Sequence, residues 1–193
     1  MLLIIKDISE RKNTEDELIR IKKAFEVASN AIWITDHRAE MVVYCNTSFK
    51  QLFKYSGEEL NKTGGSLALY ADPAAAKAVF NKVRNQGSFT SEVVLKTKDG
   101  QVLFINLYAD VVKDESGKPV AYMGIATDIT EKKRIEAELI ESRQRLSDII
   151  QFFPDPVVAI DKEGRVTAWN SAMENLTGIE AENMLGKGDY EYS

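Results

Sequence analysis

The residue types that most often carry protein chemistry are scarce in this sequence, which contains one cysteine, Cys45, and one histidine, His37. A single cysteine excludes an internal disulfide and a metal site built from several cysteines. A single histidine removes most zinc sites and most schemes that need an imidazole base. The carboxylates are numerous but too scattered to indicate a paired acid and base. We therefore expect no catalytic group and no metal site.

Other features narrow the class of protein. Gly64-Gly65 lacks the Lys-Ser/Thr of a phosphate-binding loop, which predicts only a flexible turn. The net charge of −5 gives no basic surface for nucleic acid, so we expect no nucleic-acid partner. No apolar run approaches the roughly 20 residues of a membrane helix. Together with the single cysteine, this favours a cytoplasmic protein without membrane contact.

The chain repeats itself, which is its most informative property. Residues 7–12 recur as residues 128–133 at a shift of 121, and residues 44–52 align with residues 168–176 at a shift of 124. The small change of offset indicates a loop insertion. The sequence thus predicts a piece of a tandem array: a strand remnant, a linker helix, one complete domain, a coiled-coil linker and a truncated second domain, at 1–8, 9–29, 30–130, 131–152 and 153–193.

Two charged segments, 9–29 and 130–150, carry apolar residues at alternating steps of 4 and 3, the spacing of a heptad seam. The seams run through Thr14, Leu18, Ile21, Phe25 and Ala28, and through Ile135, Leu139, Ser142, Leu146, Ile149 and Phe153. A possible capping box opens each segment, at Asp7–Glu10 and Asp128–Glu131. Each helix could lie on its own domain, but the shared register favours parallel coiled-coil linkers.

An α+β unit is predicted between these helices. Asn46 can cap a short helix, Ser56 and Glu59 have capping-box spacing, and Asp72-Pro73 can open a helix that ends near residue 86. Alternation and turn residues predict strands at 31–36, 41–45, 89–97, 101–112 and 120–127.

The order of these elements resembles the PAS family. The resemblance rests on Thr35-Asp36, Asn46-x-x-Phe49, Tyr55–Leu60, Lys98-Asp99-Gly100 and Gly124-x-x-x-Asp128-Ile129-Thr130. It implies a five-stranded antiparallel sheet with helices over one face and a pocket between. It covers residues 30–130, with 154–193 as a truncated copy that we expect to be loosely ordered alone.

The resemblance also implies a function. PAS modules bind small molecules or dimerise, and they relay their state through flanking helices to effectors such as histidine kinases or diguanylate cyclases. No effector signature is present, and His37 falls in a turn, not on a phosphoacceptor helix. We therefore expect a non-catalytic sensory segment, either a ligand sensor or a ligand-free dimerisation and relay spacer.

The sequence lacks the residues with which related PAS domains bind two cofactors, flavin and haem. Flavin-binding LOV domains place a cysteine in an Asn-Cys-Arg-Phe-Leu-Gln motif, which is absent here. The positions of the side-chain amides that hydrogen-bond the flavin in LOV domains align with Leu95, Ile105 and Ala126. These apolar side chains would leave polar atoms of the flavin unpaired. Haem-binding PAS domains use a histidine on the long helix, and this sequence has none there. LOV-type FMN and His-ligated haem are not expected, whereas FAD held in another manner stays open.

The expected sheet has two apolar faces. The inner one predicts a pocket lined by Trp33, Phe49, Leu52, Phe80, Leu95, Ile105, Leu107 and Ala126. These side chains could instead fill a solid core, and a Trp33 that points inward would occupy most of the space.

The outer face carries Val94, Phe104, Tyr108, Met123 and Ile125, more apolar surface than water usually meets. It predicts cover by the N-terminal helix, through Phe25 and Ala28, or by a second subunit in a homodimer. Asp128 and Thr130 join the last strand to the next helix. They are the expected signal-coupling residues, with plain helix capping as the alternative.

Overall fold

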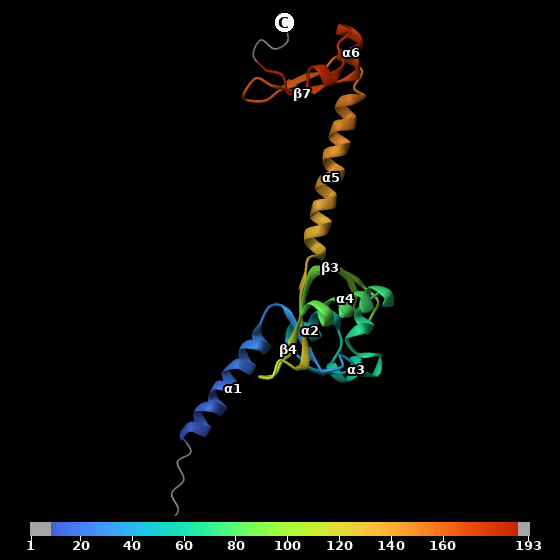
Figure 1. Cartoon of the computed structure of the whole chain (residues 1–193). Coiled ribbons are helices and arrows are strands. Elements are labelled where there is room, and N and C mark those ends of the chain that lie inside the picture. Colours follow the sequence, from blue (N-terminus) through green and yellow to red (C-terminus); the bar gives the residue numbers. More distant parts are fainter. Residues whose placement is uncertain (1–8, 189–193) are drawn as a thin grey trace, which may run out of the picture. The chain divides into compact units, whose positions relative to one another are not determined.

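A computed structural model describes residues 9–188 of the chain. The strand remnant predicted at 1–8 and the end of the second domain at 189–193 lie outside the described residues. The chain divides near residue 131 into two compact units (Figure 1).

The first unit contains a five-stranded antiparallel sheet in the order β2-β1-β5-β4-β3. Successive side chains of its long strands point to opposite faces, so one face of each can be buried even where both faces carry apolar residues. The expected fold class is confirmed. The strands are β1 Ala31–Thr35, β2 Val42–Cys45, β3 Ser88–Lys96, β4 Val102–Lys113 and β5 Pro119–Asp128.

Short helices cover one face of this sheet (Figure 1). They are α2 Thr47–Phe53, α3 Gly57–Lys62, the 3-10 helix η1 Gly65–Leu69 and α4 Pro73–Gln86. Their starts follow the sequence signals: Asn46 caps α2, Ser56 and Glu59 form a capping box, and Asp72 caps α4 ahead of a proline in its first turn. These three predicted caps are confirmed, whereas the box predicted at Asp7–Glu10 begins outside the described residues.

The turn predicted at Gly64-Gly65 is present at Gly64, and Gly65 begins η1. Both glycines have positive φ, and Gly65 is buried at the start of η1. A Cβ on Gly65 would lie 2.3 Å from the Glu40 carbonyl oxygen. The glycine is therefore required by a close backbone approach between η1 and the β1–β2 turn.

The core lies between the sheet and these helices. From the sheet it takes the inward side chains of all five strands, and from the helices the apolar sides of α2, α3, η1 and α4. Its most deeply buried members are Leu95, Ile105, Leu107 and Ala126 on strands and Phe49, Phe53, Leu60 and Leu69 on helices.

Helix α1, Ser9–Val27, precedes the sheet, and helix α5, Thr130–Gln151, begins two residues after β5 ends. Their seam residues Leu18, Ile21, Ile135, Leu139, Leu146 and Ile149 are all exposed. Their role as linkers between domains stays a prediction. Among the described helices, none is both long and apolar enough to cross a membrane.

The second unit repeats the opening of the first. It contains β6 Val158–Ile160, β7 Val166–Trp169, α6 Ser171–Thr177 and a short η2 Ala181–Asn183. Val166, Trp169 and Met184 form a small core of their own. Strands β2 and β7 have the same length and the same burial pattern, which reflects the sequence repeat.

Candidate functional site

A small cavity lies between the sheet and helices η1 and α4. Its volume is about 60 Å³, and its walls include Trp33, Tyr70, Val79, Phe80, Leu107 and Tyr122. Ligand sites usually enclose roughly 300–1,000 Å³, so this space fits a few water molecules at most. Burial raises the pKa of the Tyr70 hydroxyl, which stays neutral on the cavity wall.

Trp33 accounts for the small volume because its indole points into the core. The residue is 6% exposed, and its ring centroid lies 5.5 Å from that of Phe49 and 6.2 Å from that of Phe53. Gly124 on β5 is the direct pairing partner of Trp33 on the neighbouring strand β1. Because Gly124 has no side chain, the indole can occupy the space beside it. The ring takes up space that a ligand would need.

The predicted pocket residues divide into three groups. Trp33, Phe80 and Leu107 line the cavity. Phe49, Leu95, Ile105 and Ala126 are buried in the neighbouring core but do not reach the cavity. Leu52 is half-buried, packs against the same core and also borders a surface hollow that includes Ser29 and Asp128.

Sequence reasoning missed Tyr70, Val79, Val83 and Tyr122 on the cavity wall. Strand periodicity could have found Tyr122, because residues two positions apart share one face of a strand and Tyr122 therefore lies on the same face of β5 as Gly124 and Ala126. Tyr70 lies outside the regular elements, in a segment whose path the sequence pattern does not predict.

The outer face of the sheet is open in the single chain. Val94, Phe104 and Tyr108 are 43%, 42% and 36% exposed, whereas Met123 and Ile125 are half-buried. Helix α1 therefore does not cover the first three, and Phe25 is itself 36% exposed. Docking of a second copy on this face stays a prediction.

Asn46 connects the end of α1 to the core. Its side-chain oxygen accepts hydrogen bonds from the backbone N–H groups of Ile32 and Phe49, both at 2.9 Å. Its amide donates to the carbonyl oxygens of Phe25 at 3.0 Å and Asn30 at 2.9 Å. One fully buried side chain thus joins α1, β1 and α2.

Asn170 has the same arrangement in the second unit. Its oxygen accepts from Val157 at 2.8 Å and Met173 at 3.0 Å, and its amide donates to Phe153 at 3.1 Å and Asp155 at 2.9 Å. The segment after α5 is therefore tied to β7 and α6 as the segment after α1 is tied to β2 and α2. The alignment of residues 44–52 with residues 168–176 already paired Asn46 with Asn170. In the sequence analysis this pairing indicated only the repeat and not the shared hydrogen bonds.

The end of β5 is joined directly to α5. The Asp128 carboxylate accepts a hydrogen bond from the Thr130 N–H at 2.8 Å, which caps the helix. The Thr130 hydroxyl accepts from the Phe104 N–H at 3.0 Å, and the Ile129 N–H donates to the Phe104 carbonyl at 2.9 Å. Asp128 thus holds the helix start, while Thr130 ties it to β4.

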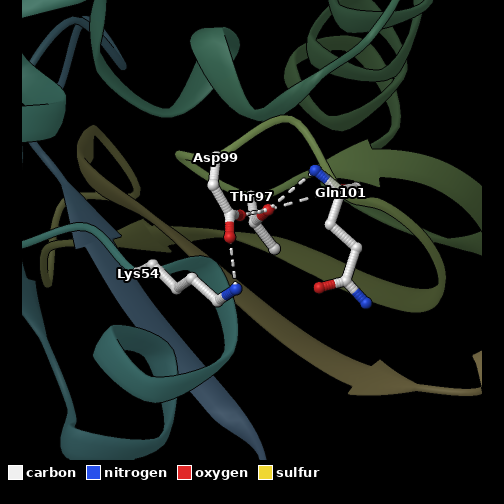
Figure 2. Close-up of polar contacts among 4 residues, drawn as sticks. All are labelled: Lys54, Thr97, Asp99 and Gln101. Carbon is white, nitrogen blue, oxygen red and sulfur yellow. Dashed lines mark hydrogen bonds and ion pairs between the residues drawn. The ribbon is translucent and has the colours of Figure 1, made fainter.

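Two ion pairs hold the turn between β3 and β4 against the helices. Lys54, at the end of α2, lies 2.5 Å from Asp99, and Lys98 lies 2.6 Å from Glu59 on α3. The Thr97 hydroxyl donates to Asp99 and accepts from the Gln101 N–H (Figure 2). All four charged groups are exposed, so each pair has water around it.

These pairs predict a dependence of stability on pH. The hydrogen bond from Lys98 lowers the pKa of Glu59 from 4.5 to about 2, and that from Lys54, with Thr97, lowers the pKa of Asp99 from 3.8 to about 2. A carboxyl whose pKa is lowered by folding stabilises the fold above its unfolded pKa and ceases to do so as pH falls through its folded pKa. We expect the thermal midpoint to fall as pH decreases from about 5 to about 2.

A Lys54→Met, Lys98→Met double variant measures the share of the two pairs in this decrease. We expect it to be less stable than wild type at neutral pH and to lose less on acidification, as measured by thermal unfolding. Lys77→Met, which removes an exposed charge of α4, is the control. An equal acid decrease in the double variant and the wild type would contradict the assignment.

The single cysteine, Cys45, is buried at the end of β2. Burial raises the pKa of the Cys45 thiol, which disfavours the nucleophilic thiolate. Within residues 9–188, no three His, Cys, Asp or Glu side chains are grouped so that they could hold a metal ion.

Comparison with known proteins gives this architecture a family. Residues 29–131 match the PAS domain family model, and residues 144–192 match the PAS fold model. A crystal structure of a PAS domain from Colwellia psychrerythraea shares 28% identity, with a TM-score of 0.53 over 60% of this chain and 99% of that one.

Among sequence relatives, sporulation kinase E of Bacillus subtilis is 26% identical over 88% of this chain, and the probable diguanylate cyclase DgcE of Escherichia coli is 28% identical over 58%. The chain spans 23% and 10% of the lengths of these two proteins. With a family match over more than half its residues, the chain belongs to the PAS domain family.

Proposed function

We propose that this segment is a dimeric relay module, which passes a conformational state from α1 through the sheet of the first unit to α5. The observation that carries the proposal is the direct hydrogen bonding at both ends of the domain. Asn46 ties the end of α1 to β1 and α2, while Asp128 and Thr130 tie the start of α5 to β5 and β4. A shift of either helix must strain the sheet.

The filled interior supports a relay over a sensor that encloses its ligand. A cavity of about 60 Å³, with Trp33 in the core beside it, leaves no room for a ligand of ordinary size. The effector would belong to another part of the parent protein. The relatives suggest a kinase or a diguanylate cyclase as this effector. We propose that the effector and this segment both lie in the cytoplasm.

The exposed seams support a homodimer. Leu18 and Ile21 on α1, like Leu139 and Leu146 on α5, have about half of their surface in water or more. Heptad positions of this kind are buried when two parallel helices pack side by side. The exposed outer sheet residues Val94, Phe104 and Tyr108 would add to the same interface.

Cysteine cross-linking of the full chain tests the dimer. In a Cys45→Ala background, Leu139→Cys should form a disulfide between two copies on mild oxidation. Ala137→Cys, on the other side of the same helix, should not. Equal cross-linking at the two positions, or none at Leu139→Cys, would overturn the parallel seam.

Hydrogen exchange then tests the relay separately from the dimer. A Leu18→Cys disulfide fixes α1, and exchange is measured in the first turns of α5 before and after reduction. The relay predicts a change in α5 exchange on reduction. Unchanged exchange, with the cross-link formed, would leave a dimeric spacer and refute the relay.

A further inference from the structure

A second, larger hollow lies on the surface of the first unit. Its volume is about 440 Å³, and its lining residues are His37, Arg38, Phe80, Arg84, Pro119 and Tyr122. At least three other surface hollows have volumes of about 370–400 Å³, so its lining residues and not its volume distinguish this one. Phe80 and Tyr122 line both this hollow and the inner cavity, with ring centroids 5.2 Å apart, so an aromatic pair forms the boundary that the two share.

The positive groups of this hollow come from well-fixed backbone. Arg38 lies in the β1–β2 turn, where the Asp36 carboxylate accepts hydrogen bonds from the N–H groups of Glu40 at 2.8 Å and Met41 at 3.3 Å. Gly65 of η1 packs against the same turn. Arg84 lies in the last turn of α4, which the Gly87 N–H closes on Val83 at 2.8 Å. Two elements far apart in sequence therefore present guanidinium groups to one hollow.

The charge around the hollow is unusual for this chain. The whole sequence carries a net charge of −5, yet no carboxylate is among the residues that line this space. Neither Arg38 nor Arg84 forms an ion pair with any residue between 9 and 188. Glu40 borders an adjoining hollow and not this one. The guanidinium groups are thus available to an anion from solution.

We propose that this hollow binds a small organic anion, with its carboxylate or phosphate on Arg38 and Arg84 and its apolar body on Phe80, Tyr122 and Pro119. Guanidinium groups bind both kinds of anion through paired hydrogen bonds, and aromatic rings provide apolar surface for the rest of the molecule. Binding does not depend on the relay. If the anion site and the relay both exist, an anion bound in the hollow contacts Tyr122 in β5. This strand ends at Asp128, just before α5 begins.

Titration of the full chain with four probes, followed by amide chemical shifts, tests the proposal. Benzoate and phenyl phosphate combine an anion with an aromatic body, benzyl alcohol lacks the charge, and inorganic phosphate lacks the body. We expect saturable shifts at Arg38, Arg84 and Tyr122 with at least one aromatic anion, with a Kd of about 1 mM or below. Whichever of benzoate and phenyl phosphate binds with the lower Kd identifies the anionic group that the hollow prefers.

Matched variants distinguish this site from general attraction of anions. Arg38→Gln and Arg84→Gln should each weaken binding about tenfold, as expected for loss of a charge-assisted hydrogen bond. Lys82→Gln removes the same charge from α4 at a residue that lies over Phe89 and should leave affinity unchanged. Phe80→Leu should weaken the aromatic anions while leaving any inorganic phosphate binding unaffected.

Three results would overturn the proposal: no saturable shift with either aromatic anion, equal affinity for inorganic phosphate, or affinity that survives both arginine substitutions. Because the arginines are exposed, their variants should fold, and unperturbed amide spectra outside the hollow check this. Binding is measured without cross-linking or α5 exchange, so the site and the relay can fail independently.

Discussion

Replacing Asn46 with alanine should cost the first unit about 4 kcal/mol of unfolding free energy, because two buried backbone N–H groups lose their acceptor at roughly 1–3 kcal/mol each. Those groups belong to Ile32 and Phe49. The carbonyls of Phe25 and Asn30 lose their donor as well. Urea unfolding followed by Trp33 fluorescence, in a Trp169→Phe background, measures the loss.

The repeat provides a matched control for this prediction. Asn170→Ala removes the equivalent hydrogen bonds from the second unit, so it should leave the Trp33 transition in place. The reverse background, Trp33→Phe with Trp169 retained, should show the opposite pattern. A loss below about 1 kcal/mol for Asn46→Ala would mean that water replaces the side chain and that the buried connection is unimportant.

Replacing Gly124 with alanine should cost about 3 kcal/mol, the upper end of what overpacking of a core usually costs. A Cβ at this position would lie 2.2 Å from Cζ2 of Trp33, which real atoms do not approach. The indole cannot simply move, because Phe49 and Phe53 pack against it. Unfolding in urea, followed by far-ultraviolet circular dichroism, measures the effect.

Two comparisons show whether the indole is the cause. Gly57→Ala adds the same methyl group where its nearest neighbours would lie 3.7 Å away, and it should change stability by less than about 0.5 kcal/mol. Trp33→Leu is destabilising by itself, but it removes the clash, so the double variant with Gly124→Ala should lose less than the sum of the two. Additive losses would place the strain elsewhere.

Much of the fold was readable because its signals are local. Asn46, Ser56 and Asp72 each cap the helix that follows them, and successive side chains of β4 alternate between the buried and the exposed face from Val102 to Tyr108. Capping depends on residues within one turn of each other, and alternation depends on the period of a strand. The tandem repeat also required only comparison of the sequence with itself.

The candidate sites depended on contacts between distant residues, which local patterns do not contain. Phe49 and Leu52 share the spacing of core positions, yet Phe49 is fully buried and Leu52 is half-buried, because the direction of α2 is set by its packing. The close approach of Gly65 to Glu40 and that of Gly124 to Trp33 are likewise tertiary. Neither glycine's role follows from its neighbours in sequence.

The sequence by itself determined the family resemblance, the element order, the single cysteine and histidine, and the two apolar faces of the sheet. Only the tertiary structure decided how much space those faces enclose, because a cavity is the difference between a backbone volume and the side chains that enter it. It is Trp33, placed opposite Gly124, that makes the interior small. The placement of Arg38 and Arg84 on one hollow beside an aromatic pair was decided in the same way, because two residues 46 positions apart in the sequence border the same space.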